Sequence, residues 1–375
     1  MNFHQLLEKM ASLDASDLFV TAKLAVSAKI NGELQPITEH VLSAEESLGL
    51  VHNAMNEKQV RQFDEEKECN FAISIDNIGR FRVSAFWQRD MAGMVIRRIV
   101  TDIPDVDDLG LPSILKDVVM SKRGLVLFVG GTGTGKSTSM ASLIGYRNRN
   151  SRGHILTIED PVEFVHEHAK CMITQREVGI DTESFDAALK SSLRQAPDVI
   201  LIGEIRNQET MEHALSFAET GHLCIATLHA NNANQAIDRI MHLVPAEQHG
   251  KLLFDLALNL RGIIAQQLVP TRDGNDRVAV IEVLLNTPYI AELIKKGDIG
   301  SIKDVMQKSN ELGMQTFDQA LFNLYQQSLI TYADAIHHAD SPNDLRLMIK
   351  LRNNDQSGTG GLAGVTIEGF EPKEN

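Results

Sequence analysis

The spacing of apolar and polar positions differs between the start of the chain and the rest. Up to residue 100, a helical start is followed by short strand-like segments, which span residues 18–20, 28–30, 79–86 and 94–100. The pair Asn31-Gly32 follows the second of them, and Asn-Gly pairs favour tight hairpin turns. The pattern predicts a small α+β N-terminal domain.

Beyond Gly124, short apolar runs alternate with helical stretches, which is typical of a largely parallel sheet covered on both faces. The apolar runs span residues 125–129, 155–158, 199–202 and 223–228. Two helical stretches carry stripes that we interpret as facing the core, namely Phe185, Leu189 and Leu193 in one and Met211, Leu215 and Ala218 in the other. Gly221 suits the C′ position after the second stretch. After Val269 the pattern is mainly helical.

The segment 101–112, TDIPDVDDLGLP, is acidic and contains two prolines and a glycine, as inter-domain linkers often do. From residue 353 onward the sequence is glycine-rich and unpatterned, which predicts a disordered tail. The 375 residues are enough for two domains. We therefore expect an α/β protein with a domain over residues 1–100, a linker over 101–112, a larger domain over 113–352 and a tail over 353–375.

The composition is that of a soluble protein, with 43% apolar and 23% charged residues. No apolar run approaches the roughly 18 to 20 residues of a membrane-spanning helix, and the start lacks a signal peptide, so we expect a cytoplasmic protein. The formal net charge of −14 disfavours nucleic acid as a partner, because such binding relies on basic surfaces. The three cysteines are far apart and lack zinc-site spacing, so we expect them to be reduced and buried.

The strongest chemical signal is a glycine-rich loop that directly follows the run 125–129 and opens a helix. It fits the pattern G-x-x-x-x-G-K-[ST], which binds nucleotide phosphates. The residues expected to bind the nucleotide are Gly130, Gly131, Thr132, Gly133, Thr134, Gly135, Lys136, Ser137 and Thr138. Glycines let backbone N–H groups wrap the phosphates, at φ angles that exclude side chains. We expect Lys136 to reach the β- and γ-phosphates of ATP and the hydroxyl of Ser137 to bind Mg²⁺.

A candidate catalytic acid follows the run 199–202, which ends in Gly203-Glu204. P-loop enzymes usually carry an Asp-Glu pair here, so Glu204 is left as the acid at the carboxyl end of the strand, where ligands bind in open α/β sheets. We expect Glu204 to polarise the attacking water or to hold a magnesium-bound one. The alternative is a solvated glutamate at a strand end.

Three further carboxylates, Glu159, Asp160 and Glu163, follow the run 155–158. Carboxylates at a Mg-ATP site hold the waters of the metal or orient the nucleophile, so we assign Glu159 to the metal and Glu163 to catalysis. Asp160 is either part of this cluster or a helix cap. The neighbouring His166 and His168 have no matched ligand set, which favours surface histidines over a metal site.

Two histidines flank the run 223–228, His222 before it and His229 after it. A histidine beyond a parallel strand, beside the phosphate loop, can sense the γ-phosphate by hydrogen bonding. We favour His229 for this role and a structural role for His222.

Together, the segments GGTGTGKST, TIEDPVEF, DVILIGEIR and TGHLCIATLHANN resemble the Walker A motif, Asp box, Walker B motif and His box of the secretion ATPase superfamily. The glycine before Glu204 is normal in that family. The resemblance covers nearly everything but the tail. It implies a homo-hexameric ring that uses ATP and Mg²⁺, with a PAS-like N-terminal domain and a RecA-like P-loop ATPase domain that has a helical C-terminal region.

Within the superfamily, the chain resembles the type IV pilus retraction ATPases. It lacks the long extra N-terminal region and the four-cysteine zinc motif of extension and type II secretion ATPases. Where PilT reads AIRNLIRE, this sequence has Ala291-Glu-Leu-Ile-Lys-Lys, and the loss of the arginine points to an auxiliary PilT-like paralogue. The resemblance implies a place at the inner membrane at the pilus base, with a PilT-like ATPase and the inner-membrane pilus platform protein as partners.

The resemblance alone assigns a catalytic role to Arg82, in GRFRVS, and Arg97, in VIRRI, which would close over the nucleotide from the N-terminal domain. Without it, both would be read as solvated strand charges. Three alternatives stay open: an autonomous PilT-type motor, another secretion or conjugation ring ATPase, and a module in which ATP binding only sets the ring shape. The presence of Glu204, Glu163 and His229 argues against the module.

Overall fold

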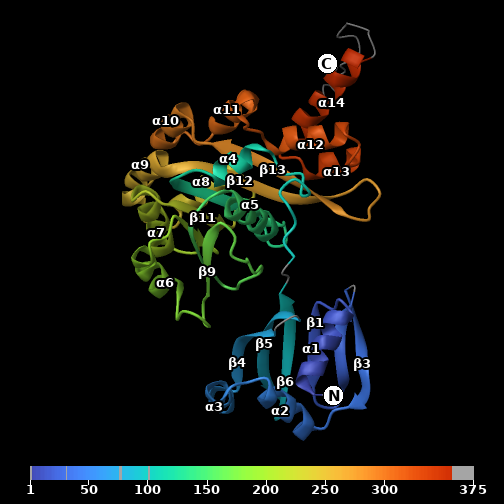
Figure 1. Cartoon of the computed structure of the whole chain (residues 1–375). Helices are drawn as coiled ribbons and strands as arrows, with labels where there is room; N and C mark the ends of the chain where they lie inside the picture. The colour runs from blue at the N-terminus through green and yellow to red at the C-terminus, as the bar shows by residue number, and fades with distance from the viewer. Residues whose placement is uncertain (1, 31, 76–77, 100–101, 357–375) are drawn as a thin grey trace, which may run out of the picture.

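The structure is a computed structural model that describes residues 2–30, 32–75, 78–99 and 102–356. Figure 1 shows two bodies, each built on its own sheet. The first is an antiparallel sheet with the strand order β3-β2-β1-β6-β5-β4. Its strands are β1 (Asp17–Thr21), β2 (Ala25–Ile30), β3 (Glu33–Val41), β4 (Glu68–Ile75), β5 (Gly79–Gln88) and β6 (Met91–Ile99). Its helices are α1 (Phe3–Ser12), α2 (Ala44–Asn53) and α3 (Glu57–Glu66).

The N-terminal sheet contains every strand predicted for this region, although Asn31 of the predicted turn and Val100 lie outside the described residues. The strands β3 and β4 were not predicted. Most positions of β3 are exposed, so its sequence lacks the alternation that marks a half-buried strand. Helices pack on the sheet through buried side chains such as Leu7 of α1 and Phe63 of α3, which meet Phe81 of β5 in one apolar core.

The second sheet has the strand order β13-β12-β7-β11-β10-β8-β9. Its strands are β7 (Gly124–Val129), β8 (Gly153–Glu159), β9 (Cys171–Glu177), β10 (Val199–Ile202), β11 (Leu223–Leu228), β12 (Leu260–Pro270) and β13 (Arg277–Leu285). All neighbours are parallel except the hairpin of β12 and β13. The predicted α/β class, with a largely parallel sheet, is confirmed.

Helices cover both faces of this sheet (Figure 1), and its central strands are therefore buried on both sides. On β7, Leu125, Leu127 and Val129 point into one core, and Val126 and Phe128 into the other. The helices are α4 (Ile114–Val119), α5 (Lys136–Asn150), α6 (Phe185–Ser192), α7 (Gln208–Glu219), α8 (Ala233–Met241), α9 (His249–Asn259), α10 (Pro288–Lys296), α11 (Ile302–Gln307), α12 (Phe317–Gln326), α13 (Tyr332–His338) and α14 (Pro342–Gln356).

The C-terminal part departs from the sequence-based expectation at one place. Residues after Val269 were expected to be mainly helical, which is wrong for β13, a strand rich in β-branched residues that pairs with β12. From Pro288 to Gln356 the regular elements are helices. The helix α14 continues to Gln356, past the tail boundary predicted at residue 353, and residues 357–375 lie outside the described part.

The two predicted helical stripes have different outcomes. Leu189 is buried, but Leu193 is 43% exposed because α6 ends at Ser192 and a 3₁₀ turn follows. The stripe on α7 is confirmed, and Gly221 follows that helix with a φ of 104°.

The three cysteines are free and buried, as expected. Among the described residues, none of the helices is long and apolar enough to span a membrane.

We propose that the two sheets fold as separate units, and Phe81→Ala tests this. Phe81 is fully buried in the N-terminal core, so the substitution should lower the stability of that unit by about 3–5 kcal/mol. Differential scanning calorimetry should show one unfolding transition moving to lower temperature. The control is Phe217→Ala in the core of the second sheet, which should move the other transition. A single transition that both variants shift would contradict separate units.

Candidate nucleotide-binding site

A cavity of about 210 Å³ lies where the carboxyl ends of four parallel strands of the second sheet meet. Its lining comes from the segments after β7, β8, β10 and β11. The sequence-predicted residues that line it are Thr132, Gly133, Lys136, Ser137, Glu159, Glu163, Glu204 and His229. The structure therefore brings the glycine-rich loop, the acids and one histidine together.

The glycine-rich loop leaves the buried strand β7 and ends at Lys136, the first residue of α5. Gly130, Gly133 and Gly135 have φ angles of 152°, 76° and 83°, which side chains disfavour. Gly131 differs, because its φ is not positive and an added Cβ would lie 3.8 Å from the nearest atom, in Thr134. The expectation that no side chain fits in the loop is thus wrong for Gly131, where the surrounding protein leaves room for a Cβ atom.

Gln266 of β12 supports this loop and was missed by the sequence analysis. An added Cβ at Gly130 would lie 2.5 Å from its carbonyl oxygen, and one at Gly135 would lie 2.8 Å from its Nε2 atom. Gln266 is only 3% exposed. The sequence feature that could have identified Gln266 is the polar pair Gln266-Gln267 within the otherwise apolar run 263–269.

Lys136 lies at the centre of the loop. Its Nζ atom donates to the carbonyl oxygens of Gly130, at 2.8 Å, and Gly131, at 2.6 Å. Burial lowers the pKa of Lys136, while the carboxylates of Glu204 and Glu163 act in the opposite direction. The ammonium group therefore lies within the field of the acids across the cavity.

Glu159 ends β8 and is held by two neighbours. The hydroxyl of Thr157 donates to its Oε1 atom at 2.6 Å, and the Gln175 amide donates to the same oxygen at 3.3 Å. Burial raises the pKa of Glu159, and these two hydrogen bonds partly oppose the shift. Gln175 also donates to the carbonyl of Phe164 at 2.9 Å and accepts from the N–H of His166 at 2.8 Å. It lies on β9, which the sequence did not predict.

Glu204 follows β10 and lies between two cationic or polar partners. Its Oε2 atom accepts from Nε of Arg206 at 2.7 Å, and its Oε1 atom lies 3.0 Å from Nε2 of His229. The Glu204 side chain is 19% exposed, and that of His229 is 49% exposed. Arg206 also contacts Asp160 at 3.3 Å, so it bridges the segments after β8 and β10.

The structure also bears on the alternative roles considered for Asp160 and for the histidines near β8 and β11. Asp160 does not cap a helix, because a bend and an irregular segment follow it rather than a helix. His166 is half-buried and lines the cavity, so its assignment as a surface residue is wrong. Burial lowers the pKa of His166 to about 4, with a smaller contribution from Arg149. His168 is exposed, and the Nδ1 atom of His222 lies 3.2 Å from the carbonyl oxygen of Phe217 in α7.

The arginines of the N-terminal sheet do not line the cavity. Arg82 lies against the second sheet, with its guanidinium 3.4 Å from Oε1 of Glu177 and 3.5 Å from the carbonyl oxygen of Val162. Arg97 forms an ion pair with Asp17 at 2.7 Å within the N-terminal sheet. Arg82 is therefore close to the segment that carries Glu159 and Glu163, and Arg97 is not in contact with it.

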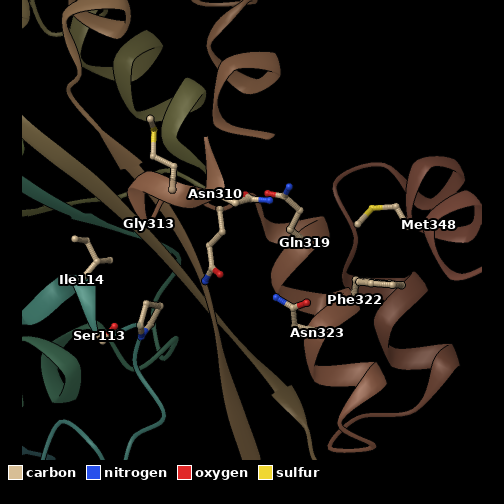
Figure 2. A pocket seen from close by; sticks show the side chains of 11 residues that line it. Ser113, Ile114, Asn310, Gly313, Gln319, Phe322, Asn323 and Met348 are labelled. Atoms are coloured by element: carbon tan, nitrogen blue, oxygen red, sulfur yellow. The ribbon is translucent and has the colours of Figure 1, made fainter. Parts of the chain in front are cut away.

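A second cavity, of about 460 Å³, lies between the N-terminus of α4 and the helices α12 and α14 (Figure 2). Amide side chains such as Asn310 and Gln319 line it, and none of its lining residues is charged. The amides of Gln319 and Gln315 already donate to backbone carbonyls, at 3.0 Å and 2.8 Å. Because it has neither cations nor a glycine-rich loop, this cavity does not fit a nucleotide phosphate.

A phosphate loop between a parallel strand and a helix, with acids and a histidine at the ends of neighbouring strands, defines a P-loop nucleotide hydrolase. The chain belongs to the family of Type II/IV secretion system proteins, whose family model matches residues 2–325. The resemblance inferred from the four motifs is thereby confirmed.

Individual relatives support the same family assignment. The chain is 62% identical to the type IV pilus ATPase PilU of Pseudomonas aeruginosa, over 94% of this chain and 92% of that protein. It is 40% identical to the type IV pilus retraction ATPase PilT of the same organism, over 91% of this chain and 99% of PilT. The crystal structure of the pilus retraction motor PilT with bound ADP superposes with a TM-score of 0.86 at 37% identity, covering 93% of this chain and 100% of that chain.

The two neighbouring glycines of the loop give a matched test of its geometry. Gly130→Ala should lower the free energy of unfolding by more than about 1 kcal/mol, because the new Cβ meets the backbone of Gln266 at a disfavoured φ. Gly131→Ala should change it by less than about 0.5 kcal/mol. Urea unfolding without nucleotide measures both. Equal losses in the two variants would show that the contact with Gln266 does not constrain the loop.

Proposed function

We propose that this chain is an ATP-hydrolysing subunit that supports type IV pilus retraction and twitching motility, as an auxiliary to a PilT-like ATPase. The observation that carries the proposal is the 62% identity to PilU, which extends over 94% of this chain. The cavity at the strand ends supplies the chemistry that such a role needs. The closeness to PilU rather than PilT favours the auxiliary role over an autonomous motor.

The loop residues 130–138 hold the phosphates of ATP in this proposal. Backbone N–H groups of the loop and the N-terminus of α5 provide partial positive charge, and Lys136 exchanges its two loop carbonyls for β- and γ-phosphate oxygens. Exchange is favourable because a charged phosphate is a stronger acceptor for an ammonium group than a carbonyl oxygen.

The residues around the loop also fit Mg²⁺, which prefers oxygen ligands. Ser137, Glu159 and Glu204 provide a hydroxyl and two carboxylates in the lining of the cavity. When bound, Mg²⁺ would neutralise charge on the β- and γ-phosphates. The hydrogen bonds from Thr157 and Gln175 orient Glu159 so that one of its oxygens stays available to the metal's waters.

Glu204 acts on the attacking water in this proposal. Its two oxygens are oriented by Arg206 and His229, so the carboxylate has a defined direction before ATP arrives. Glu163, in the segment after β8, lines the same cavity and helps to orient the water. His229, in contact with Glu204, can report the presence of a γ-phosphate to the acid that works on it.

The N-terminal arginines couple hydrolysis to motion in this proposal. Arg82 moves from Glu177 to the γ-phosphate when the two sheets approach, and Arg97 joins it after leaving Asp17. A charge that reaches the phosphate only on closure makes turnover depend on domain movement. We further propose a homo-hexamer in the cytoplasm, bound at the inner membrane at the pilus base through the pilus platform protein.

Glu204→Gln tests whether hydrolysis, rather than binding alone, is the function. The variant should bind ATP normally but hydrolyse it about 10²–10⁴-fold more slowly, because the general base is lost. Phosphate release by the purified chain and binding of a fluorescent ATP analogue measure the two properties. In cells that lack the native protein but contain PilT, the variant should fail to restore forceful pilus retraction.

Lys136→Ala provides the control, since it should lose both binding and hydrolysis. If Glu204→Gln restores retraction as well as the unmodified chain does, the protein is a nucleotide-dependent interaction module and not a motor. If the unmodified chain neither hydrolyses ATP nor affects retraction, the proposed function is wrong.

Arg82→Ala tests the coupling between the two sheets. ATP affinity should change little, whereas turnover should fall sharply, by as much as the ~10³–10⁵-fold that removal of an arginine finger costs elsewhere. Steady-state phosphate release and equilibrium binding separate the two effects. The matched control is Arg98→Ala, which removes an arginine of the same sheet that pairs with the exposed Asp14. Equal, small effects of both substitutions would make Arg82 an ordinary surface charge.

A further inference from the structure

The buried carboxylate of Glu282 is not used by the proposed mechanism. It projects from the middle of β13, is only 2% exposed and accepts a hydrogen bond from the backbone N–H of Ala233 at 2.8 Å. Ala233 is the first residue of α8. The backbone N–H of Phe317, the first residue of α12, also favours its charged form. One carboxylate thus serves the N-termini of two helices, where negative charge is stabilising.

The segment anchored in this way carries His229. Only residues 230–232 separate His229 from α8, so the path from the end of β11 to the helix is short. At one end, Leu228 is paired with Val129 in the sheet. At the other end, Asn232 caps α8 by accepting from Gln235 at 2.9 Å, and Glu282 accepts the N–H of the next residue. The position of His229 beside Glu204 depends on both ends.

A second connection ties the same segment to the C-terminal helices. The Asn232 amide donates to Asp340 at 3.3 Å, and Asp340 forms an ion pair with Lys303 of α11 at 2.8 Å. Asp318 of α12 in turn accepts from the N–H of Asp340 at 2.9 Å. Lys303 favours the charged form of Glu282 and Asp340 disfavours it, so the Glu282 carboxylate lies within the field of this network.

We propose that Glu282 is a positioning residue that fixes the first turn of α8 and thereby holds His229 against Glu204. The body of α8 is held independently, because Ala236, Ile237 and Ile240 are fully buried in the core. Loss of the carboxylate therefore loosens the start of the helix without releasing the helix. The inference rests on the role of His229 in the proposed function.

Burial supports this assignment. It raises the pKa of Glu282 to about 7, with Asp340 acting in the same direction and Lys303 and the two N–H groups acting against it. The N–H donors of Ala233 and Phe317 oppose this rise, because hydrogen bonds to a carboxylate favour its ionised form. Those donors are the helix starts that the proposal invokes.

A double-mutant cycle on the purified full-length chain tests the proposal, with ATP turnover as the readout. Glu282→Gln and His229→Ala should each lower kcat about three- to thirtyfold while KM changes by less than about twofold. The double variant should be no slower than His229→Ala, because Glu282 acts through His229. Hydrogen–deuterium exchange should rise in Glu282→Gln for peptides that cover residues 229–236.

Asn286→Ala is the matched control, since it removes two hydrogen bonds near the end of the same hairpin, to the carbonyls of Ala257 and Leu260, without touching α8. It should leave kcat and the exchange of residues 229–236 unchanged. If the two losses multiply in the double variant, Glu282 acts independently of His229 and the inference is wrong, although the proposed function stands. If His229→Ala turns over normally, the proposed role of His229 fails instead.

A further variant is needed if Glu282→Gln fails to fold, which the loss of a cooperative unfolding transition would show. Asp340→Ala removes the acceptor of the Asn232 amide from a partly exposed position, and the same cycle applies to it. A smaller loss of kcat that disappears in the His229→Ala background supports the anchor. A loss that persists in that background overturns it.

Discussion

The parallel pairing of β7, β11, β10 and β8 is the constraint on which the site depends. Ile202 pairs with both Ala226 and Ile158, and Leu228 pairs with Val129. The residues that follow these positions must therefore emerge at one edge of the sheet. A shift of one strand by one residue would turn its buried side chains to the opposite face, so the two apolar cores that fix the register also fix the distances among the groups that line the cavity.

Support for the site comes from polar residues on strands that interrupt apolar runs. Gln175 on β9 orients Glu159, Gln266 on β12 packs beneath the glycine-rich loop, and Glu282 on β13 meets the start of α8. Each is a buried or half-buried polar group, which is costly unless it has partners. Gln175 and Glu282 have such partners in the carboxylate of Glu159 and the backbone N–H of Ala233. Gln266 instead packs closely against Gly130 and Gly135, and its Oε1 atom has no hydrogen-bond partner among the described residues.

The same residues explain what the sequence could and could not predict. The four uninterrupted apolar runs predicted β7, β8, β10 and β11 correctly, and the residues at their ends line one cavity. The strands β9, β12 and β13 were missed or read as helical because Gln175, Gln266 and Glu282 break their apolar patterns. A local pattern has no information about a partner distant in the chain, and for that reason the contacts of Arg82 with Glu177 and of Arg206 with Asp160 could not be predicted either.

The contacts of Arg82 bear on the cost of the closing movement that we propose. Glu177 is buried, so its removal from Arg82 would be expensive if the carboxylate were left alone. It keeps the N–H of Val162 at 3.3 Å when Arg82 leaves, whereas Arg80, at 3.9 Å, lies on the same strand as Arg82 and moves with it. Asp17 likewise keeps the hydroxyl of Ser16 at 2.9 Å when Arg97 leaves. Each arginine therefore exchanges one anionic partner for another, and the free energy of closure is determined mainly by the phosphate that it meets.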